Sequence, residues 1–453
     1  GLSDVIIGIQ GENTSYVVFG KASGFSAIME LFSLDGSNGF RLDGVSGSLG
    51  SSVSNAGDVN GDGYDDLIVG AHDAYPNGSS SGSSYVVFGK ASGFSAILDL
   101  SRLDGSKGFR LDGNATNDFS GASVSNAGDV NGDGFDDLIV GASGADPNGY
   151  SSGSSYIIFG RSDFGRVVGS PGAAVTYELA NLDGSNGFRL DGEALDSSGS
   201  SVSTAGDING DGFDDVIIGA SFADPNGELS GSSYVVFGKA SGFNAAMNLS
   251  DLDGNNGFRL DGVSAYARLG LSVSNAGDVN GDGFDDVIVG AYGADPNNGE
   301  LSGSSYVVFG KASGFNATMN LSVLDGSNGF RLDGEAAGDM SGISVSNAGD
   351  VNGDGFDDVI VGAAGADPNG NSSGSSYVVF GKASGFSATL EFSSLDGSNG
   401  FRLDGVAWLD HSGFSVSSAG DVNGDGFDDL IVGADGADPN GYDSGSSYVV
   451  FGK

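Results

Sequence analysis

Continuous apolar runs alternate with mixed polar runs along the whole chain and give it a strand-like pattern. In a representative stretch, residues 136–142 read DDLIVGA and residues 154–160 read SSYIIFG, with the apolar residues consecutive in both. Such runs of strand length are typical of strands buried on both faces of a sheet. Residues 109–113, FRLDG, instead alternate large apolar and charged side chains, which predicts a strand with one wet face.

A fourth run consists mainly of small residues. Residues 120–130 read SGASVSNAGDV, and a strand with so little bulk suits a place where several backbones converge. A sheet that is apolar on both faces needs a neighbouring sheet on each side, and radially stacked blades meet that need. We therefore predict an all-β propeller of four-stranded antiparallel blades with the small-residue strand innermost. The long linker at residues 90–108 is expected to wrap one rim.

An acidic phrase, DVNGDGFDD with rare variants, returns six times and sets the length of the repeat. Its copies recur at intervals of about 70 residues, a period that indicates a repeat architecture. We predict a single propeller domain over residues 1–453. Its repeat units cover about 1–37, 38–107, 108–186, 187–256, 257–328, 329–399 and 400–453.

Counting the strand-like runs predicts seven blades. The DDLIVGA-type run occurs seven times if residues 3–8 are included, and the YVVFG-type run also occurs seven times. The small-residue and FRLDG runs occur six times each, so the first blade is expected to lack its innermost strand and the last its outermost. A six-bladed ring with an extra half-unit is the alternative. Because the chain opens and stops within a repeat, we expect it to be a piece of a longer polypeptide.

Composition favours a folded, strongly acidic protein. Sixty Asp and Glu against 17 Lys and Arg give a formal charge of −43, and 29 Phe with 14 Tyr supply material for a core. This charge disfavours nucleic acid and anionic membranes as partners and attracts divalent cations. Cysteine is absent, which excludes disulfides, and no apolar run reaches the length of a membrane span.

The acidic phrase carries the donor pattern of a calcium loop. Side-chain oxygens occur at positions 1, 3, 5 and 9, as in Asp129, Asn131, Asp133 and Asp137, and position 7, Phe135, can offer its carbonyl. A glycine at position 6 permits the sharp turn, and oxygen donors at alternating positions wrap a hard cation. Only two histidines, His72 and His411, are present, and both are isolated in the sequence, so a softer metal is excluded.

The loop differs from the helix-loop-helix calcium hand. That motif needs a bidentate Glu at position 12, where this chain has a strand residue such as Val140. The loop is therefore expected to join two strands. The aspartate at position 8, Asp65, Asp136 and their equivalents, is expected to point away from the metal and to be solvated. Six turns that bind no metal are the weaker alternative.

About six Ca²⁺ ions are predicted, one in each complete loop. The candidate metal ligands are Asp58, Asn60, Asp62, Tyr64 and Asp66; Asp129, Asn131, Asp133, Phe135 and Asp137; Asp207, Asn209, Asp211, Phe213 and Asp215; Asp278, Asn280, Asp282, Phe284 and Asp286; Asp350, Asn352, Asp354, Phe356 and Asp358; and Asp421, Asn423, Asp425, Phe427 and Asp429.

The units resemble FG-GAP repeats, which occur in the head of integrin α subunits and in many bacterial surface proteins. The residues that carry the resemblance are GFSVSSAGD at 413–421 and the VGA that ends the second strand, as at 69–71 and 140–142. The resemblance covers nearly the whole chain and implies a seven-bladed propeller with calcium between the first and second strands of a blade. All six loops match its ligand pattern, whereas the first unit keeps only a trace of a loop. The near-identity of the units is more typical of bacterial than of animal members.

We predict a non-enzymatic, calcium-binding extracellular module of a larger surface protein, with a scaffold, adhesion or protein-interaction role and a bacterial cell-surface location. Its expected partner is a protein or glycan ligand on a propeller rim, with no nucleic acid and no membrane insertion. No catalytic residue and no organic cofactor are predicted, because the candidate acids are repeated six-fold and catalysis seldom uses six equal sites. A lectin-like propeller, or a non-catalytic accessory domain of a polysaccharide-degrading enzyme, is the alternative.

Two further features leave a choice open. Residues 161–180 replace the usual KASGFSA segment and are either a surface insertion or a site for a partner. The Asp-Pro-Asn turns that begin at Asp146, Asp224, Asp295, Asp367 and Asp438 are either simple turns or a ring of repeated contacts.

Overall fold

The computed structural model describes residues 2–9, 11–44, 47–164, 174–296 and 299–453. Its regular structure consists of β-strands and six one-turn 3₁₀ helices. Within these residues, no helix has the length and apolar character needed to cross a lipid bilayer.

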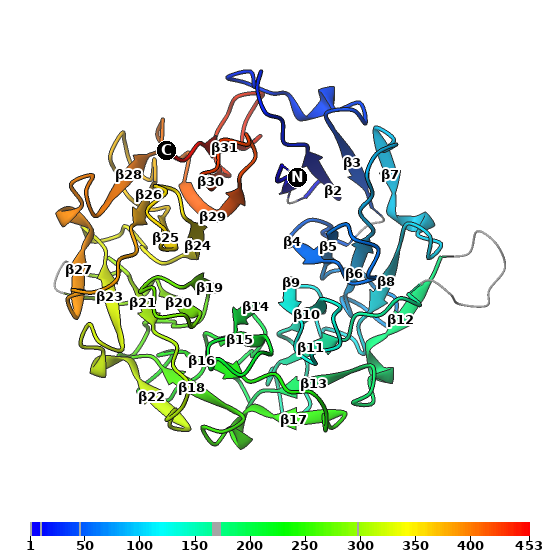
Figure 1. Cartoon of the computed structure of the whole chain (residues 1–453), viewed down its shortest axis with the longest axis horizontal. Coiled ribbons are helices and arrows are strands. Elements are labelled where there is room, and N and C mark those ends of the chain that lie inside the picture. Colours follow the sequence, from blue (N-terminus) through cyan, green and yellow to red (C-terminus); the bar gives the residue numbers. More distant parts are fainter. Residues whose placement is uncertain (1, 10, 45–46, 165–173, 297–298) are drawn as a thin grey trace. The chain divides into compact units, whose positions relative to one another are not determined.

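The strands of the described residues form seven sheets (Figure 1). In chain order they are β1 (Val5–Ile9), β2 (Thr14–Val18), β3 (Gly39–Asp43) and β7 (Ile97–Asp99); β4 (Val53–Gly57), β5 (Asp66–Ala71), β6 (Ser83–Val87), β8 (Gly108–Asp112) and β12 (Thr176–Glu178); β9 (Ser123–Gly128), β10 (Asp137–Ala142), β11 (Ser154–Ile158), β13 (Gly187–Asp191) and β17 (Ala246–Asn248); β14 (Ser201–Gly206), β15 (Asp215–Ala220), β16 (Ser232–Val236), β18 (Gly257–Asp261) and β22 (Thr318–Asn320); β19 (Val273–Gly277), β20 (Asp286–Ala291), β21 (Ser304–Val308), β23 (Gly329–Asp333) and β27 (Thr389–Glu391); β24 (Ser344–Gly349), β25 (Asp358–Ala363), β26 (Ser375–Val379) and β28 (Gly400–Asp404); and β29 (Ser412–Gly420), β30 (Asp429–Ala434) and β31 (Ser446–Val450). The 3₁₀ turns are η1 (Leu31–Ser33), η2 (Leu100–Arg102), η3 (Leu179–Asn181), η4 (Leu249–Asp251), η5 (Leu321–Val323) and η6 (Phe392–Ser394).

The chain forms two compact units. Unit 1 comprises Gly1–Thr204, Phe213–Ile218 and Phe237–Leu252, and unit 2 comprises Ala205–Gly212, Gly219–Val236 and Asp253–Lys453. Unit 1 holds the first three sheets, and unit 2 holds the last three. The single domain over residues 1–453 and its repeat boundaries stay predictions.

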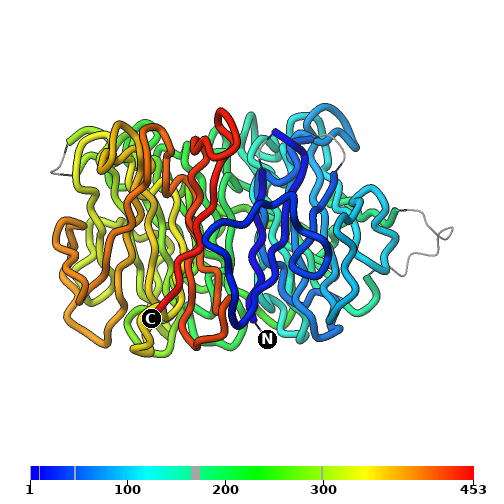
Figure 2. The backbone as a smooth tube through the Cα atoms, turned by 90° about the horizontal axis from the view of Figure 1, so that it is seen from above, coloured from blue at the N-terminus to red at the C-terminus, as the bar shows by residue number. Residues whose placement is uncertain are grey.

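The fold class predicted from the sequence is confirmed: the protein is an all-β, seven-bladed propeller with smaller first and last blades. The first sheet lacks a small-residue strand before β1, and the last ends at β31 without an FRLDG-type strand. Figure 2 follows the last sheet, in orange to red, up and down through its antiparallel strands.

The continuous apolar runs are buried on both faces, as predicted. Every residue of β10 and of β11 is buried, and the two strands pair antiparallel from Leu138↔Ile158 to Ala142↔Ser154. Side chains from these strands, including Leu138 and Tyr156, belong to one apolar cluster with residues of the preceding sheet such as Ile68 and Phe109. Neighbouring blades in unit 1 therefore share a core.

The small-residue strands pack closely against one another within each unit. The backbone N–H of Val124 on β9 donates to the hydroxyl of Ser52, just before β4, at 3.0 Å, and Val345 donates to Ser272 in the same way. A Cβ on Gly141 of β10 would collide with the carbonyl of Gly199. Larger side chains at these positions would hold the backbones apart, which explains the composition of the run.

Four strands per blade were predicted, and most blades of the described residues have a fifth strand in addition. The segment between the third and fourth strands of a blade, here called the strap, runs back to the preceding blade. In unit 1, the strap between β6 and β8 contains β7, which pairs in parallel with β3 of the first blade. Phe94 of this strap stacks on Phe40 of β3, with ring centroids 4.7 Å apart. The linker that was expected to wrap a rim thus connects two consecutive blades by strand pairing and ring stacking.

Residues 161–180 also serve as a strap. Phe164 stacks on Phe109 at 4.4 Å, and β12 pairs in parallel with β8. The flanks of this unusual segment therefore keep the structural role of KASGFSA, and residues 165–173 of it lie outside the described residues.

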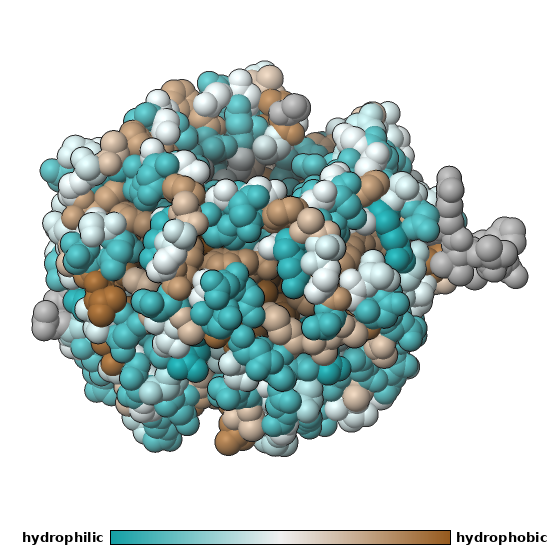
Figure 3. Space-filling view, turned by 60° about the horizontal axis from the view of Figure 1, so that its bottom comes forward, coloured by the Kyte–Doolittle hydropathy of each residue, from teal (hydrophilic) through white to brown (hydrophobic). Residues whose placement is uncertain are grey.

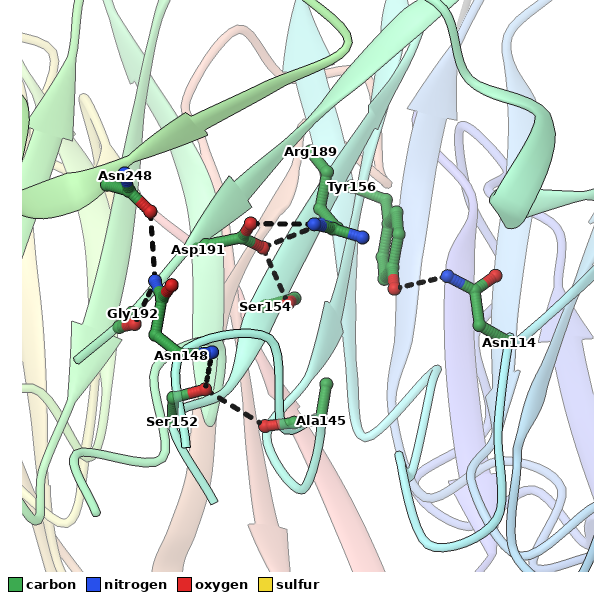
Figure 4. Close-up of polar contacts among 10 residues, drawn as sticks. All are labelled: Asn114, Ala145, Asn148, Ser152, Ser154, Tyr156, Arg189, Asp191, Gly192 and Asn248. Carbon is green, nitrogen blue, oxygen red and sulfur yellow. Dashed lines mark hydrogen bonds and ion pairs between the residues drawn. The ribbon is translucent and has the colours of Figure 1, made fainter. Parts of the chain in front are cut away.

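The FRLDG strand is less exposed to solvent than predicted. Asp191 on β13 is buried because the Arg189 guanidinium binds it at 2.6 Å and the Ser154 hydroxyl donates to it at 2.9 Å (Figure 4). The charged face of this strand is thus satisfied by neighbouring side chains instead of water. Hydrophilic residues cover much of the surface seen in Figure 3, with smaller hydrophobic areas among them.

Candidate metal centre

Each acidic loop joins the first and second strands of a blade, as predicted. The loop of the third blade leaves β9 at Gly128 and enters β10 at Asp137, where the pairing of the two strands shifts register. The loop therefore begins and ends on a rigid hairpin, which fixes its two ends relative to each other.

The position-1 aspartate organises the loop from within. In the third blade, the Asp129 carboxylate accepts the backbone N–H groups of Asp133 at 3.0 Å and Gly134 at 2.8 Å. The position-5 carboxylate, Asp133, in turn accepts the N–H of Phe135 at 3.0 Å. The position-1 contacts recur in all six loops, at 2.8 to 3.1 Å.

The position-9 aspartate is fully buried. The Asp137 carboxylate, 0% exposed, accepts the N–H groups of Gly160 at 2.8 Å and Val130 at 3.0 Å. Burial raises the pKa of Asp137 to about 8; the two N–H groups lower it, and the neighbouring carboxylates of Asp133 and Asp129 raise it. Burial, followed by neighbouring carboxylates, likewise raises the pKa of Asp286 to about 8 and the pKa values of Asp66 and Asp358 to about 7.

In the part of the chain that the structure describes, these buried carboxylates are not paired with a cationic side chain. No ion pair among the described residues involves Asp137, Asp286 or Asp358. A buried carboxylate surrounded by further carboxylates is costly unless a positive charge compensates it. This charge deficit is the structural observation that fits a bound cation.

The donor types of the loop, which are carboxylate, amide and carbonyl oxygens, fit a hard cation. Among the described residues, no three acidic or histidine side chains are grouped as ligands of one ion. Asn60 at position 3 lies 3.1 Å from Asp66 through its amide nitrogen, and rotating the amide would present its oxygen instead. In the third acidic loop, Asp207, Asn209 and Asp211 belong to unit 2, and Phe213 and Asp215 to unit 1.

The expectation that position 8 is solvated is wrong in all described loops but the first. The Asp136 carboxylate is half-buried and accepts the backbone N–H of Asp58, the position-1 residue of the preceding loop, at 2.7 Å. The contact recurs from Asp129 to Asp214, Asp207 to Asp285, Asp278 to Asp357 and Asp350 to Asp428, at 2.8 to 3.0 Å. Only Asp65, in the first loop, is exposed as expected.

A second contact joins consecutive loops. A Cβ on Gly61, at position 4, would collide with the ring of Phe135 from the next loop, and Gly61 has φ +72°. The same arrangement holds between Gly281 and Phe356 in unit 2. The position-7 aromatic residue therefore has a packing role besides its predicted carbonyl ligand, and glycine is required at position 4.

The Asp-Pro-Asn turns lie at the other end of the second strand and are firmly held. The Asn148 amide donates to the carbonyl of Gly192 at 3.0 Å and to Asn248 Oδ1 on β17 at 2.9 Å (Figure 4). Its backbone N–H donates to the Ser152 hydroxyl at 3.2 Å. Asn77, Asn226 and Asn369 make the equivalent bond to a glycine carbonyl. The asparagine thus has a structural role; the turn at Asp295–Asn298 lies partly outside the described residues.

Sequence reasoning missed the tyrosines exposed near these turns, and its expectation that Trp408 is partly buried in a rim loop is wrong. Tyr150 is 75% exposed in the loop between β10 and β11, and Trp408 is 64% exposed in the loop between β28 and β29. Tyr75 and Tyr442 occupy equivalent turn loops and are also exposed. Their positions vary among the repeats, and that variation inside a near-identical array was the available signal.

A seven-bladed propeller with an oxygen-donor loop in six of its blades defines the class of this protein. The FG-GAP repeat family profile matches residues 49–87, 120–158, 198–236, 269–308, 341–379 and 412–450, together more than half of the chain. The chain belongs to the FG-GAP repeat family and is an integrin-like propeller.

Curated relatives include integrin α chains from several animals. The chain is 31% identical to integrin alpha-4 of Xenopus laevis over 39% of its own length and 15% of that protein. It is 33% identical to integrin alpha-V of Gallus gallus over 44% of its length and 18% of the relative. A match to integrin alpha pat-2 of Caenorhabditis elegans is 29% identical over 62% of this chain and 22% of the relative. The chain thus spans less than a quarter of each.

Removing the position-8 contact is expected to weaken the junction between blades. Asp136→Ala leaves the N–H of Asp58 without its acceptor and should lower the free energy of unfolding by about 1–3 kcal/mol. Asp136→Asn keeps a hydrogen-bond acceptor and should lower the free energy of unfolding by less. Asp65→Ala is the matched control, because its carboxylate is exposed, and should change stability by less than about 0.5 kcal/mol. Urea titration of the three variants measures these differences, and equal losses at Asp136 and Asp65 would contradict the assignment.

The buried position-9 aspartates predict an unusual pH dependence in the presence of a chelator. Their folded-state pKa values lie above the ordinary value, so the folded state holds protons that the unfolded state releases. Stability from these groups is complete below about pH 4 and is lost as the pH rises through about 8. The melting temperature of the metal-free protein should therefore fall across this interval, and Asp137→Asn should flatten the fall. A melting temperature that rises with pH in chelator would refute this prediction.

Proposed function

We propose that the protein is a calcium-stabilised, non-enzymatic propeller that acts as an adhesion or ligand-binding module of an extracellular surface protein. The observation that carries the proposal is the buried position-9 carboxylate in loops of the FG-GAP pattern, for which Asp137, Asp286 and Asp358 form no ion pair among the described residues. Similarity to integrin α chains supports the adhesive role and the extracellular setting. A bacterial cell surface stays a prediction from the near-identity of the units.

The metal would be held by oxygen donors of the acidic loop. In the third blade these are Asp129, Asn131, Asp133, Asp137 and the carbonyl of Phe135. Such a set fits Ca²⁺ better than Mg²⁺, which retains its waters and needs stricter octahedral geometry. The ion would supply the positive charge that the buried carboxylate lacks and would link the two strands of the hairpin. About six such sites follow from the six loops.

The turn loops are the better candidates for ligand contact. They lie at the end of the second strand opposite the acidic loop, so a ligand there leaves the metal sites undisturbed. Tyr150 is exposed on such a turn, which hydrogen bonds hold in place; Trp408 is exposed in the loop between β28 and β29, where the Asn369 amide of another such turn donates to the carbonyl of Gly405. Rigid aromatic residues of this kind are enriched in protein interfaces.

The cluster of Ser51, His72 and Asp73 lacks the geometry of a catalytic triad. His72 Nδ1 lies 2.9 Å from the hydroxyl of Ser51, and its Nε2 lies 3.6 Å from Asp73. The second distance exceeds hydrogen-bond range, so the aspartate does not orient the ring as an acyl-transfer triad requires. The other histidine, His411, lies 3.3 Å from Asp435. We therefore keep the non-enzymatic proposal.

Calcium should raise the melting temperature of the protein, and a chelator should lower it. Asp133→Asn removes one exposed ligand and should weaken calcium binding at its loop while barely changing the melt in chelator. Asp104→Asn is the matched control, because Asp104 is exposed in a turn outside the acidic loops. Calorimetric titration should count about six ions per chain, one per loop. A melt insensitive to calcium and chelator would rule out the metal sites.

The ligand-binding half of the proposal is tested by binding the intact chain to panels of extracellular-matrix proteins and glycans in calcium. Tyr150→Ser or Trp408→Ser should weaken binding to a captured ligand about ten-fold if that residue is an interface anchor. Phe32→Ser, which removes an exposed aromatic residue from η1, should have no effect. Binding of several equivalent glycans per chain would favour a lectin instead. Turnover of a polysaccharide would overturn the non-enzymatic assignment.

A further inference from the structure

Arg268 is the one arginine without a carboxylate partner among the residues that the structure describes. Every other described arginine lies 2.5 to 3.2 Å from an aspartate; these are Arg41, Arg102, Arg110, Arg161, Arg189, Arg259, Arg331 and Arg402. The chain has 60 acidic residues against 17 basic ones, so carboxylates are abundant. A guanidinium that pairs with none of them is available to an anion from outside the chain.

Arg268 lies in the loop between β18 and β19, beside the turn loop between β15 and β16. Both loops belong to unit 2. The backbone N–H of Arg268 donates to the carbonyl of Leu229 at 3.0 Å, and that of Tyr266 donates to the carbonyl of Glu228 at 2.7 Å. These bonds fix the two loops against each other, so their side chains belong to one hydrogen-bonded surface.

Two aromatic rings and a carboxylate accompany the guanidinium. The Arg268 guanidinium lies over the ring of Phe222, 5.0 Å from its centroid. The Tyr266 hydroxyl donates to the Glu228 carboxylate. Phe222 is 40% exposed and Tyr266 is 52% exposed, so both rings reach solvent. Phe222, Glu228, Tyr266 and Arg268, here called the Arg268 cluster, thus combine a cation, a hydrogen-bond acceptor and exposed ring surface.

The Arg268 cluster departs from the repeat at several positions at once. Four other repeats have glycine at the position of Phe222, and four have aspartate at the position of Ala267, immediately before the arginine. These residues are Gly144, Gly293, Gly365 and Gly436, and Asp118, Asp196, Asp339 and Asp410. One place in a near-identical array therefore gains a ring and a cation and loses an acid. Such joint changes of charge and aromatic surface indicate a binding site that the other repeats do not share.

The chemistry of the cluster fits a sugar that carries a carboxylate. A guanidinium forms paired, charge-assisted hydrogen bonds with a carboxylate. The Glu228 carboxylate can accept hydrogen bonds from hydroxyl groups, and an exposed aromatic ring can pack against the apolar face of a pyranose. An acidic peptide would also pair with Arg268, but its carboxylates would then lie close to Glu228 and be repelled by it. A carboxylated sugar supplies both the anion and the hydroxyl donors.

We infer that the Arg268 cluster binds a uronic acid residue of an extracellular polysaccharide, at one site per chain. The sugar carboxylate would pair with Arg268, its hydroxyls would donate to Glu228, and its ring would pack against Tyr266. Phe222 would hold the guanidinium in place from behind. This inference rests on the proposed ligand-binding role of the turn loops and names the ligand class for one of them.

Trigalacturonate and the matching neutral galactose trisaccharide test the inference on the intact 453-residue chain, by calorimetric titration at a fixed calcium concentration. Trigalacturonate should bind at one per chain and at least about ten-fold more tightly than the neutral sugar, because the neutral sugar lacks the charge-assisted hydrogen bonds. Its affinity should fall as the salt concentration rises. Amide exchange should slow in residues 221–231 and 262–272 and stay unchanged in residues 334–343, the equivalent loop before β24.

The chain's own repeats supply variants that the backbone accommodates. Arg268→Met introduces the side chain found at the equivalent Met340 and should weaken trigalacturonate binding at least about ten-fold. Tyr266→Gly introduces the residue found at the equivalent Gly338 and suits the φ of +63° at this position, and it should also weaken binding. Arg102→Met is the matched control, because Arg102 is exposed in η2 of unit 1, and it should leave binding unchanged.

Equal binding of the two sugars, unchanged affinity in Arg268→Met, several sites per chain or protection of other loops would overturn the inference. So would a tetra-aspartate peptide that binds the same loops more tightly than trigalacturonate, since an acidic peptide would then be the ligand. The melting temperature of the same samples with and without calcium separates this inference from the metal sites. A chain that calcium stabilises but that binds no trigalacturonate refutes only the sugar site, and the reverse result refutes only the metal sites.

Discussion

Strands that are apolar on both faces cannot remain in contact with water, and this constraint governs the architecture. Each such sheet must have another sheet on either side, and a run of near-identical repeats supplies identical neighbours. The burial of whole strands such as β10 and β11 is the direct result. The small residues of β9 follow from the same requirement, because blades that cover each other completely must bring their first strands close together.

The same packing creates the electrostatic problem of the acidic loops. The aspartate at position 9 is the first residue of a buried strand and is therefore removed from water. The aspartates at positions 1 and 5 place further carboxylates beside it. Backbone N–H groups compensate part of this charge, as Gly160 and Val130 do for Asp137. The remaining deficit is what a divalent cation would supply. Position 8 shows a different solution, since Asp136 is held by the backbone of the neighbouring loop.

The strands, their class and their burial could be predicted from the sequence because each depends on local pattern. The blade count and the incomplete first and last blades followed from counting these patterns. The fifth strand could not be foreseen, because β7 pairs with β3 of another blade and its three residues carry no strand signal of their own. Asp136 was misjudged for the same reason: its partner lies 78 residues away. The pattern within one loop predicts candidate donors, but it does not reveal which groups of a neighbouring blade lie against them.

The strap has a consequence for synthesis. The outer strand of the second blade, β8, is covered by β12, which follows β11 of the third blade in the chain. The outer strand of a blade that emerges from the ribosome therefore stays an unpaired edge strand until much of the next blade has been translated. The strap of the next blade covers the edge strand of each newly made blade, so folding is completed in one direction along the polypeptide. The most recently made blade is always the one whose open edge could associate with another chain.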